Sequence, residues 1–140
     1  MSPERVIPAP QRNPEVEPFY KAAGEGRFLI RRCTKCRRFH WYPRSCCPFC
    51  RGTTEWVEGS GKGKIYSYSV MRRVKAPFVL AYVELAEGPR MMTNLVNCDF
   101  DALAIGQEVA LVFRAADDGT MIPCFTPVAG SQSTRERKLP

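Results

Sequence analysis

The sequence predicts a mainly β protein in which one short helix precedes a small cysteine-bearing unit and a five-stranded barrel. Two C-x-x-C pairs within residues 33–50 mark the small unit. Five short runs of alternating or apolar residues, separated by turn residues, follow between residues 65 and 125. We therefore expect an N-terminal arm and helix over 1–26, the cysteine unit over 27–58, the barrel over 59–128 and a flexible tail over 129–140.

The basic residues are concentrated in the first half of the chain. Residues 1–75 hold 16 Lys or Arg against 6 Asp or Glu, whereas residues 76–140 hold 5 against 8. A basic half suits nucleic acid, an acidic protein surface or a polyphosphate ligand such as coenzyme A. The charge alone does not choose between these partners.

The sequence carries no signal for a membrane or an export pathway. No apolar run approaches the roughly 20 residues that a membrane helix needs, and the first 18 residues contain no apolar segment of the signal-peptide kind. We therefore expect a cytoplasmic protein, whose thiols stay reduced. Seven cysteines in such a protein point to a metal rather than to disulfides.

The N-terminal region predicts a loose arm followed by a short helix. Residues 1–13 are rich in proline and polar groups, and we expect them to be available to a partner. The helix that follows has a proline for its first turn, Pro14 or Pro18, and a glycine for its end, Gly24 or Gly26. A helix of seven to ten residues is unstable alone in water. We therefore expect it to pack on this protein or on another one.

The cysteine pattern predicts one structural zinc ion. The pairs CTKC and CPFC are separated by ten residues and supply Cys33, Cys36, Cys47 and Cys50. A tight turn in each pair points both sulfurs at one centre, and two such turns complete the tetrahedron that zinc prefers, with Zn–S distances of about 2.3 Å. Four thiolates leave no open position for water. The zinc is therefore expected to be structural and not catalytic.

Two neighbouring residues could replace a ligand in this assignment. Cys46 precedes Cys47, but only Cys47 has the C-x-x-C spacing to Cys50. His40 is the only histidine, and we interpret it as a partly exposed loop residue. Iron, or a redox-active pair of thiols, is the less favoured reading of the four cysteines.

The region after residue 58 predicts the barrel. GSGKG at 59–63 is expected to be a flexible joint. In the first strand, Tyr66, Tyr68 and Val70 alternate as core residues do. Five strands are too few for a two-sheet sandwich and suit a small barrel such as the OB-fold. The expected strands lie at 65–73, 78–85, 90–96, 108–115 and 121–125.

The segments GRFLIRRCTKCRRFHWYPRSCCPFC and SGKGKIYSYS resemble the zinc-ribbon/OB-fold family associated with acyl-CoA thiolases, aldolases and hydratases. The resemblance covers about residues 15–127 and implies a rubredoxin-like zinc ribbon followed by an OB-fold domain. The sequence departs from the pattern at Arg37, where zinc ribbons often have glycine, and at the additional Cys46. Both departures concern loop geometry, because neither removes a ligand.

This resemblance implies a non-catalytic accessory subunit of an acyl-CoA thiolase or thiolase-like aldolase. Such a subunit belongs to a hetero-oligomer in which the partner supplies the catalytic residues. The chain itself has no pairing of a nucleophile with a base. Cys98 and Cys124 lie in or near predicted strands, where a buried, inert cysteine is the usual case. The alternative is a module that binds single-stranded nucleic acid, with Tyr66 and Tyr68 as a stacking platform.

A further expectation concerns acyl-CoA itself. The phosphates of coenzyme A attract arginines through bidentate hydrogen bonds. Arg72, Arg73, Lys75 and Arg90 are the candidates for this role, and a solvated basic face is the competing interpretation of each.

Overall fold

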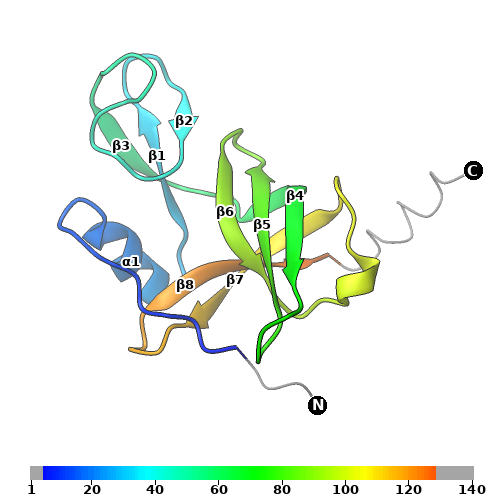
Figure 1. Ribbon diagram of the computed structural model, residues 1–140. Helices are drawn as coiled ribbons and strands as arrows, with labels where there is room; N and C mark the ends of the chain where they lie inside the picture. The colour runs from blue at the N-terminus through cyan, green and yellow to red at the C-terminus, as the bar shows by residue number, and fades with distance from the viewer. Residues whose placement is uncertain (1–4, 129–140) are drawn as a thin grey trace, which may run out of the picture.

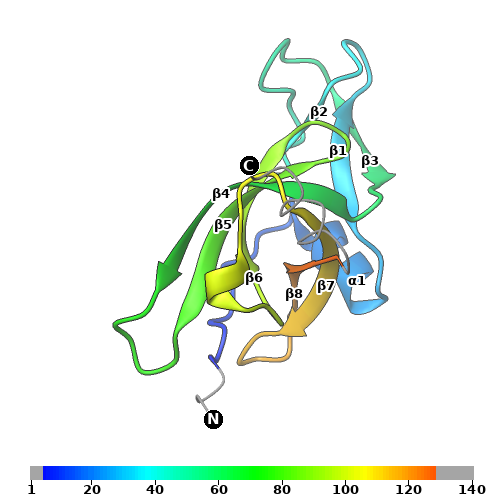
Figure 2. The same cartoon turned by 90° about the vertical axis from the view of Figure 1, so that its right-hand side faces the viewer.

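The computed structural model describes residues 5–128, which form a small three-stranded sheet joined to a closed barrel (Figures 1 and 2). In chain order the elements are α1 (Glu17–Gly24), β1 (Leu29–Cys33), β2 (Phe39–His40), β3 (Thr54–Glu58), β4 (Lys62–Met71), β5 (Phe78–Leu85), β6 (Arg90–Leu95), the 3-10 helix η1 (Phe100–Ala102), β7 (Glu108–Ala115) and β8 (Met121–Pro127). The tail predicted over 129–140 lies outside the described residues.

The barrel has the strand order β4-β5-β6-β8-β7 and closes through the pairing of β7 with β4. Its pairs are antiparallel except for β6 and β8, which run parallel. The predicted five-stranded OB-type barrel is therefore confirmed. Apolar residues at alternate positions fill its interior, among them the fully buried Ile65, Val79, Val83, Val109 and Phe125.

The prediction that Tyr66 and Tyr68 belong to the barrel core is wrong. Tyr66 is 48% exposed and Tyr68 is 36% exposed. The pairing of β4 with β5 shifts register between Ile65 and Ser67, as at a β-bulge. The bulge adds one residue to the strand, so that Ile65 takes the core position and Tyr66 turns outward. The hydroxyl of Tyr68 donates to the carbonyl of Leu103 at 3.1 Å.

The small sheet has the order β2-β1-β3 and stands at one end of the barrel (Figure 1). The predicted helix is confirmed as α1, with Pro18 in its first turn, and it packs beside β8 and β1. The ring of Phe19 lies edge-on to the rings of Phe28 and Trp41, at centroid distances of 6.1 and 5.3 Å. This aromatic cluster joins the helix to the small sheet.

The predicted flexible joint at 59–63 is held in place by hydrogen bonds. The N–H of Gly59 donates to the carbonyl of Phe28 at 2.8 Å, and the N–H of Leu111 donates to the carbonyl of Gly61 at 2.7 Å. Lys62 and Gly63 already belong to β4. The connection is therefore short and fixed, because both sides of it pair with neighbouring segments.

The N-terminal arm lies on the chain's own barrel over its described part. The N–H of Asp117 donates to the carbonyl of Ile7 at 2.9 Å, and Arg12 forms an ion pair with Glu17 at 2.7 Å. The expectation of a loose arm available to a partner is corrected for residues 5–13, because these contacts tie the arm to the turn between β7 and β8 and to α1.

None of the helices within residues 5–128 has the length and apolar character required to cross a membrane.

The close approach of β4 and β5 generates a stability prediction. A Cβ atom at Gly63 would lie 2.6 Å from Cγ1 of Val83 and 2.8 Å from the carbonyl oxygen of Glu84. We expect Gly63→Ala to destabilise the protein by about 1–3 kcal/mol, because this crowding forces the strands apart. The matched control is Gly24→Ala, whose Cβ meets nothing within 4 Å. Thermal unfolding checks both, and equal midpoints for Gly63→Ala and wild type would contradict the described contact.

Candidate metal centre and basic surfaces

Four sulfur atoms converge where the loops of the small sheet meet. The Sγ atoms of Cys33, Cys36, Cys47 and Cys50 all lie within 4.8 Å of one another. Cys33 and Cys50 are 3.4 Å apart, and Cys36 and Cys47 are 3.7 Å apart. Sulfurs placed tetrahedrally around zinc at the usual bond length are about 3.8 Å apart. The donor set and its spacing therefore fit a four-thiolate zinc site.

Backbone N–H groups of each turn point at the first sulfur of its pair. The N–H groups of Lys35 and Cys36 both donate to Sγ of Cys33 at 3.3 Å, and the N–H of Phe49 donates to Sγ of Cys47 at 3.3 Å. Hydrogen bonds of this kind stabilise a thiolate. The turns therefore orient the sulfurs and also favour the charged form that a metal requires.

The pKa values of the first pair differ in direction. Burial by itself raises the pKa of Cys33, but the N–H groups of Cys36 and Lys35 outweigh it and lower that pKa to about 6. At Cys36 the N–H of Arg38 lowers the pKa, yet burial and the adjacent thiols raise it to about 11. Burial also raises the pKa of Cys47, but the N–H groups of Cys50 and Phe49 outweigh it and lower that pKa, so the first sulfur of each pair is favoured as a thiolate.

Three residues that are not ligands shape the turns. Arg37 and Arg51 directly follow the two pairs, and both have left-handed backbone conformations, with φ of 67° and 66°. Arg37 thus occupies the position where glycine is common. A Cβ at Gly52 would lie 3.2 Å from Sγ of Cys33. Gly52 was not among the predicted site residues, although a glycine two residues after a C-x-x-C pair is a signal that could have identified it.

Neither alternative ligand joins the cluster. Cys46 is exposed, and its thiol contacts the carbonyl of Arg51 at 3.6 Å. His40 is only 3% exposed and lies in β2, with Nε2 3.3 Å from the carbonyl of Arg44. The interpretation of His40 as a partly exposed loop residue is therefore wrong. β2 is so short that the sequence alternation did not identify it as a strand.

Two cysteines outside the cluster and two turn aspartates that the sequence drew attention to have structural roles. Burial raises the pKa of Cys124 to about 11 and also raises the pKa of Cys98, which is half-buried. Asp99 caps η1 by accepting from the N–H of Asp101 at 3.0 Å, and Asp118 accepts from the N–H of Thr120 at 2.9 Å. Cys124 is buried, as the sequence predicts, whereas Cys98 is only half-buried.

The four candidate contacts for coenzyme A do not form one cluster. Arg72, Arg73 and Lys75 lie at the end of β4 and in the loop that follows it, where Arg72 pairs with Asp101 at 2.9 Å. Arg90 lies near the opposite end of β4, because it pairs in register with Glu84, which in turn pairs with Lys64 near the start of β4. A single phosphate group cannot contact Arg90 and the β4–β5 loop together.

An exposed apolar face covers the outside of β4, β5 and β6. Its members Tyr66, Tyr82 and Met92 are 48%, 47% and 59% exposed, and Tyr82 and Met92 are register partners. The guanidinium of Arg90 lies 4.0 Å from the ring centre of Tyr66. We call these four residues the outer face.

The outer face borders a cleft between the small sheet and the β5–β6 turn. The cleft has a volume of about 600 Å³ and is lined by Arg37, Arg38 and Phe49 on one side and by Glu87 and Arg90 on the other. Arg38 stacks on the half-exposed ring of Phe49 at 3.6 Å. Figure 1 shows the β5–β6 turn reaching toward the small sheet. Arg90 is common to the cleft and to the outer face, so the two surfaces are continuous.

Comparison with known proteins finds relatives over nearly the whole chain. Residues 21–57 match the family described as the rubredoxin-like zinc ribbon domain of ChsH2, and residues 56–114 match its C-terminal OB-fold domain. A probable enoyl-CoA hydratase alpha subunit of Thermomonospora curvata is 35% identical in an alignment of 139 positions that covers 94% of this chain and 43% of that protein. This chain therefore spans less than half the length of that relative.

Two further relatives are similar in length to this chain. The benzoylsuccinyl-CoA thiolase subunit BbsA of Thauera aromatica is 30% identical in an alignment of 107 positions that covers 68% of this chain and 74% of BbsA. A chain in the solved structure of the Ltp2–ChsH2(DUF35) aldolase is 36% identical, with a TM-score of 0.74. The match covers 85% of this chain and 98% of that chain.

The metal centre generates a paired prediction. We expect Cys36→Ser to lose bound zinc and to lower the thermal midpoint by more than about 10 °C, because a structural metal contributes many kcal/mol of folding energy. Cys46→Ser should keep both zinc and stability, because its sulfur lies outside the cluster. Metal analysis of the purified proteins and thermal unfolding check the pair. Loss of zinc from Cys46→Ser with retention by Cys36→Ser would overturn the ligand assignment.

Proposed function

This chain belongs to the DUF35 family, with the ChsH2 type of zinc ribbon and OB-fold domains, and we propose that it is a non-catalytic accessory subunit of an acyl-CoA thiolase or thiolase-like aldolase. The observation that carries the proposal is the match of 98% of a chain in the Ltp2–ChsH2(DUF35) aldolase at 36% identity. The named thiolase subunit and hydratase subunit among the relatives support the same class of partner.

The chemistry of the chain agrees with an assembly role. The four clustered cysteines would hold one zinc ion, and a zinc ion with four thiolate ligands has no open position for water or substrate. Burial raises the pKa of the thiols of Cys98 and Cys124, and the sole histidine is buried with Nε2 beside the carbonyl of Arg44. We therefore assign the bond-making residues to the catalytic partner.

We propose that the outer face and the adjoining cleft form the docking surface for that partner. Aromatic residues, Met and Arg are the residue types enriched in protein interfaces, and Tyr82, Met92 and Arg90 lie together on one sheet face. Arg37 and Arg38 add positive charge along the cleft. The fitting partner surface is an apolar patch bordered by carboxylates.

We also propose that the β4–β5 loop contacts acyl-CoA at the shared interface. Arg72, Arg73 and Lys75 bring three positive charges to one loop, and a diphosphate is recognised best by several such groups. Arg90, at the other end of the strands, serves the docking surface in this proposal.

The division of the chain and its location complete the proposal. We divide it into an arm and helix over 1–26, a zinc ribbon over 27–58, an OB-fold barrel over 59–128 and a tail over 129–140. We place the complex in the cytoplasm, because all seven cysteines are free thiols in this structure and a zinc–thiolate site needs reduced sulfur.

One observation favours the alternative of single-stranded nucleic-acid binding. Tyr66 and Tyr82 face outward beside Arg90 and could stack on bases. The ring of Tyr66 is already covered by the guanidinium of Arg90, which leaves Tyr82 as the open platform. Salt-dependent binding of the isolated chain to single-stranded DNA would support this alternative.

The partner proposal is tested by co-expression with the thiolase or aldolase encoded beside this chain. We expect a stable complex with acyl-CoA activity that neither protein shows alone. The double variant Tyr82→Glu/Met92→Glu should weaken the complex at least tenfold, because it places charges in the centre of an apolar interface. The matched control is Ile105→Glu, which changes an apolar residue that is 69% exposed elsewhere on the chain. Equal complex formation by all variants would contradict the docking surface, and absence of any complex would contradict the function.

The coenzyme A proposal is tested on the assembled complex. We expect Arg72→Glu/Arg73→Glu to raise the KM for the acyl-CoA substrate by about tenfold and to leave kcat nearly unchanged, because the change acts on binding of the phosphates. The charge-matched control is Lys62→Glu/Lys64→Glu at the other end of β4. An unchanged KM in the loop variant would reject the role of these arginines.

A further inference from the structure

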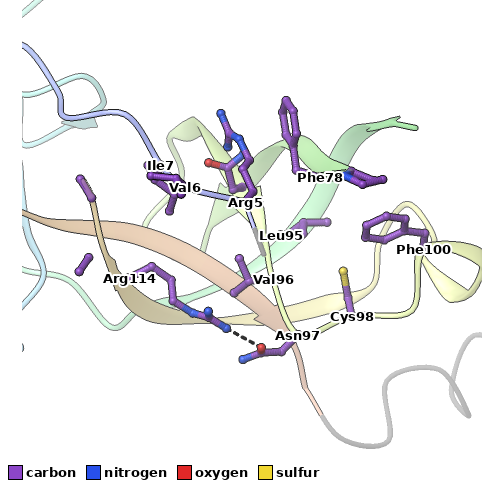
Figure 3. Close-up of a pocket in the computed structure, with 14 residues that line it drawn as sticks. Arg5, Val6, Ile7, Phe78, Leu95, Val96, Asn97, Cys98, Phe100 and Arg114 are labelled. Atoms are coloured by element: carbon purple, nitrogen blue, oxygen red, sulfur yellow. Dashed lines mark hydrogen bonds between the residues drawn. The ribbon is translucent and has the colours of Figure 1, made fainter. Parts of the chain in front are cut away.

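A cavity of about 530 Å³ opens at the end of the barrel beneath the N-terminal arm (Figure 3). Its walls come from the arm, the start of β5, the segment from β6 to η1 and the end of β7. The volume lies within the range of small-molecule sites and exceeds the packing voids of a protein interior. This cavity is separate from the metal centre and from the outer face.

Two arginines from distant parts of the sequence reach this cavity. Arg5 belongs to the arm, and its guanidinium lies 3.8 Å from the ring centre of Phe78. Arg114 belongs to β7 and donates to Oδ1 of Asn97. Figure 3 shows Arg5 with Phe78 on one side of the cavity and Arg114 with Asn97 on the other. The ring of Phe78 thus holds Arg5 in position, and the amide of Asn97 holds Arg114.

The polar groups of the lining are those that suit a negatively charged ligand. Beside the two arginines, the lining contains the amides of Asn94 and Asn97, and none of its described residues is acidic. Asp101, nearby in η1, is outside the lining and pairs with Arg72 at 2.9 Å. The described lining therefore favours a negatively charged group, and the carboxylate on its margin is that of Asp99, which adds to the effect of burial in raising the pKa of Cys98.

The rest of the lining is apolar. Leu95 is buried at the base of the cavity, and Val96, Phe100 and Pro77 extend the apolar surface from it. Cys98 lies among them, and its thiol is neutral because burial raises its pKa. Such a surface suits a hydrocarbon body of modest size.

We propose that this cavity binds a small organic anion, an apolar carboxylate whose head is held by Arg5 and whose hydrocarbon part lies against Leu95 and Phe100. A carboxylate accepts charge-assisted hydrogen bonds from guanidinium groups. The arm forms one wall of the site, and the bond from the N–H of Asp117 to the carbonyl of Ile7 holds it in this position. This inference does not depend on the proposed function, since the site lies wholly within one chain.

The test uses the full-length chain with its zinc and the probe octanoate, with 1-octanol as the uncharged comparison. Isothermal titration calorimetry should show octanoate binding at one site and 1-octanol binding at least tenfold more weakly. Arg5→Gln should weaken octanoate about tenfold or more, as expected for loss of a charged hydrogen-bond partner. The matched control is Arg12→Gln, in the same arm but paired with Glu17, which should bind octanoate as wild type does.

A second variant tests the cavity itself while leaving the charge of Arg5 in place. Cys98→Trp should fill the cavity and abolish octanoate binding while Arg5 and the zinc content are unchanged. Amide NMR shifts on adding octanoate should be confined to the lining, at Asn97, Cys98 and Ala116. The proposal is overturned if octanoate does not bind, if 1-octanol binds equally well, if Cys98→Trp still binds it, or if the shifts map elsewhere.

Discussion

The structure depends on bringing four sulfur atoms to one point. Between residues 27 and 58 few side chains are buried, and two of them, Cys33 and Cys47, belong to the cluster itself. A sheet of this size cannot supply the apolar burial that offsets the entropy of ordering it. A bound structural zinc contributes on the order of 10–16 kcal/mol of apparent folding energy. The positions of β1, β2 and β3 therefore follow from the coordination geometry more than from packing.

The aromatic cluster transmits this rigidity to the barrel. Phe28 precedes β1, and Trp41 follows β2, so both rings are positioned by the small sheet. Phe19 lies against both rings from α1, and α1 in turn packs on β8. The N–H of Gly59 also bonds to the carbonyl of Phe28, and a Cβ at Gly59 would lie 3.0 Å from the Phe28 ring. The zinc ribbon is thus braced at its base, which fixes the cleft beside the β5–β6 turn and keeps it continuous with the outer face.

Most of the architecture could be predicted because its signals are local. The C-x-x-C spacing identifies the four sulfurs without any structure, and the five strands follow from short apolar runs bounded by turns. The exposure of Tyr66 could not be predicted, because a bulge after Ile65 depends on the pairing of β4 with β5 and not on β4 alone. The burial of His40 and the course of the arm also arise from contacts between segments that are distant in sequence. The cavity beneath the arm could not be predicted for the same reason, since Arg5 and Arg114 are 109 positions apart in the sequence.

The backbone conformation of Arg37 and Arg51 has a consequence for the evolution of this ribbon. A left-handed conformation costs a non-glycine residue roughly 1–2 kcal/mol, a cost that glycine avoids. Each arginine instead retains a positive charge directly after a pair of ligands, beside a centre whose four thiolates and one zinc ion would sum to two negative charges. Selection at these two positions thus sets ease of folding against neutralisation of the centre. Substitution by lysine or asparagine would separate the two pressures, since lysine keeps the charge and asparagine tolerates the conformation.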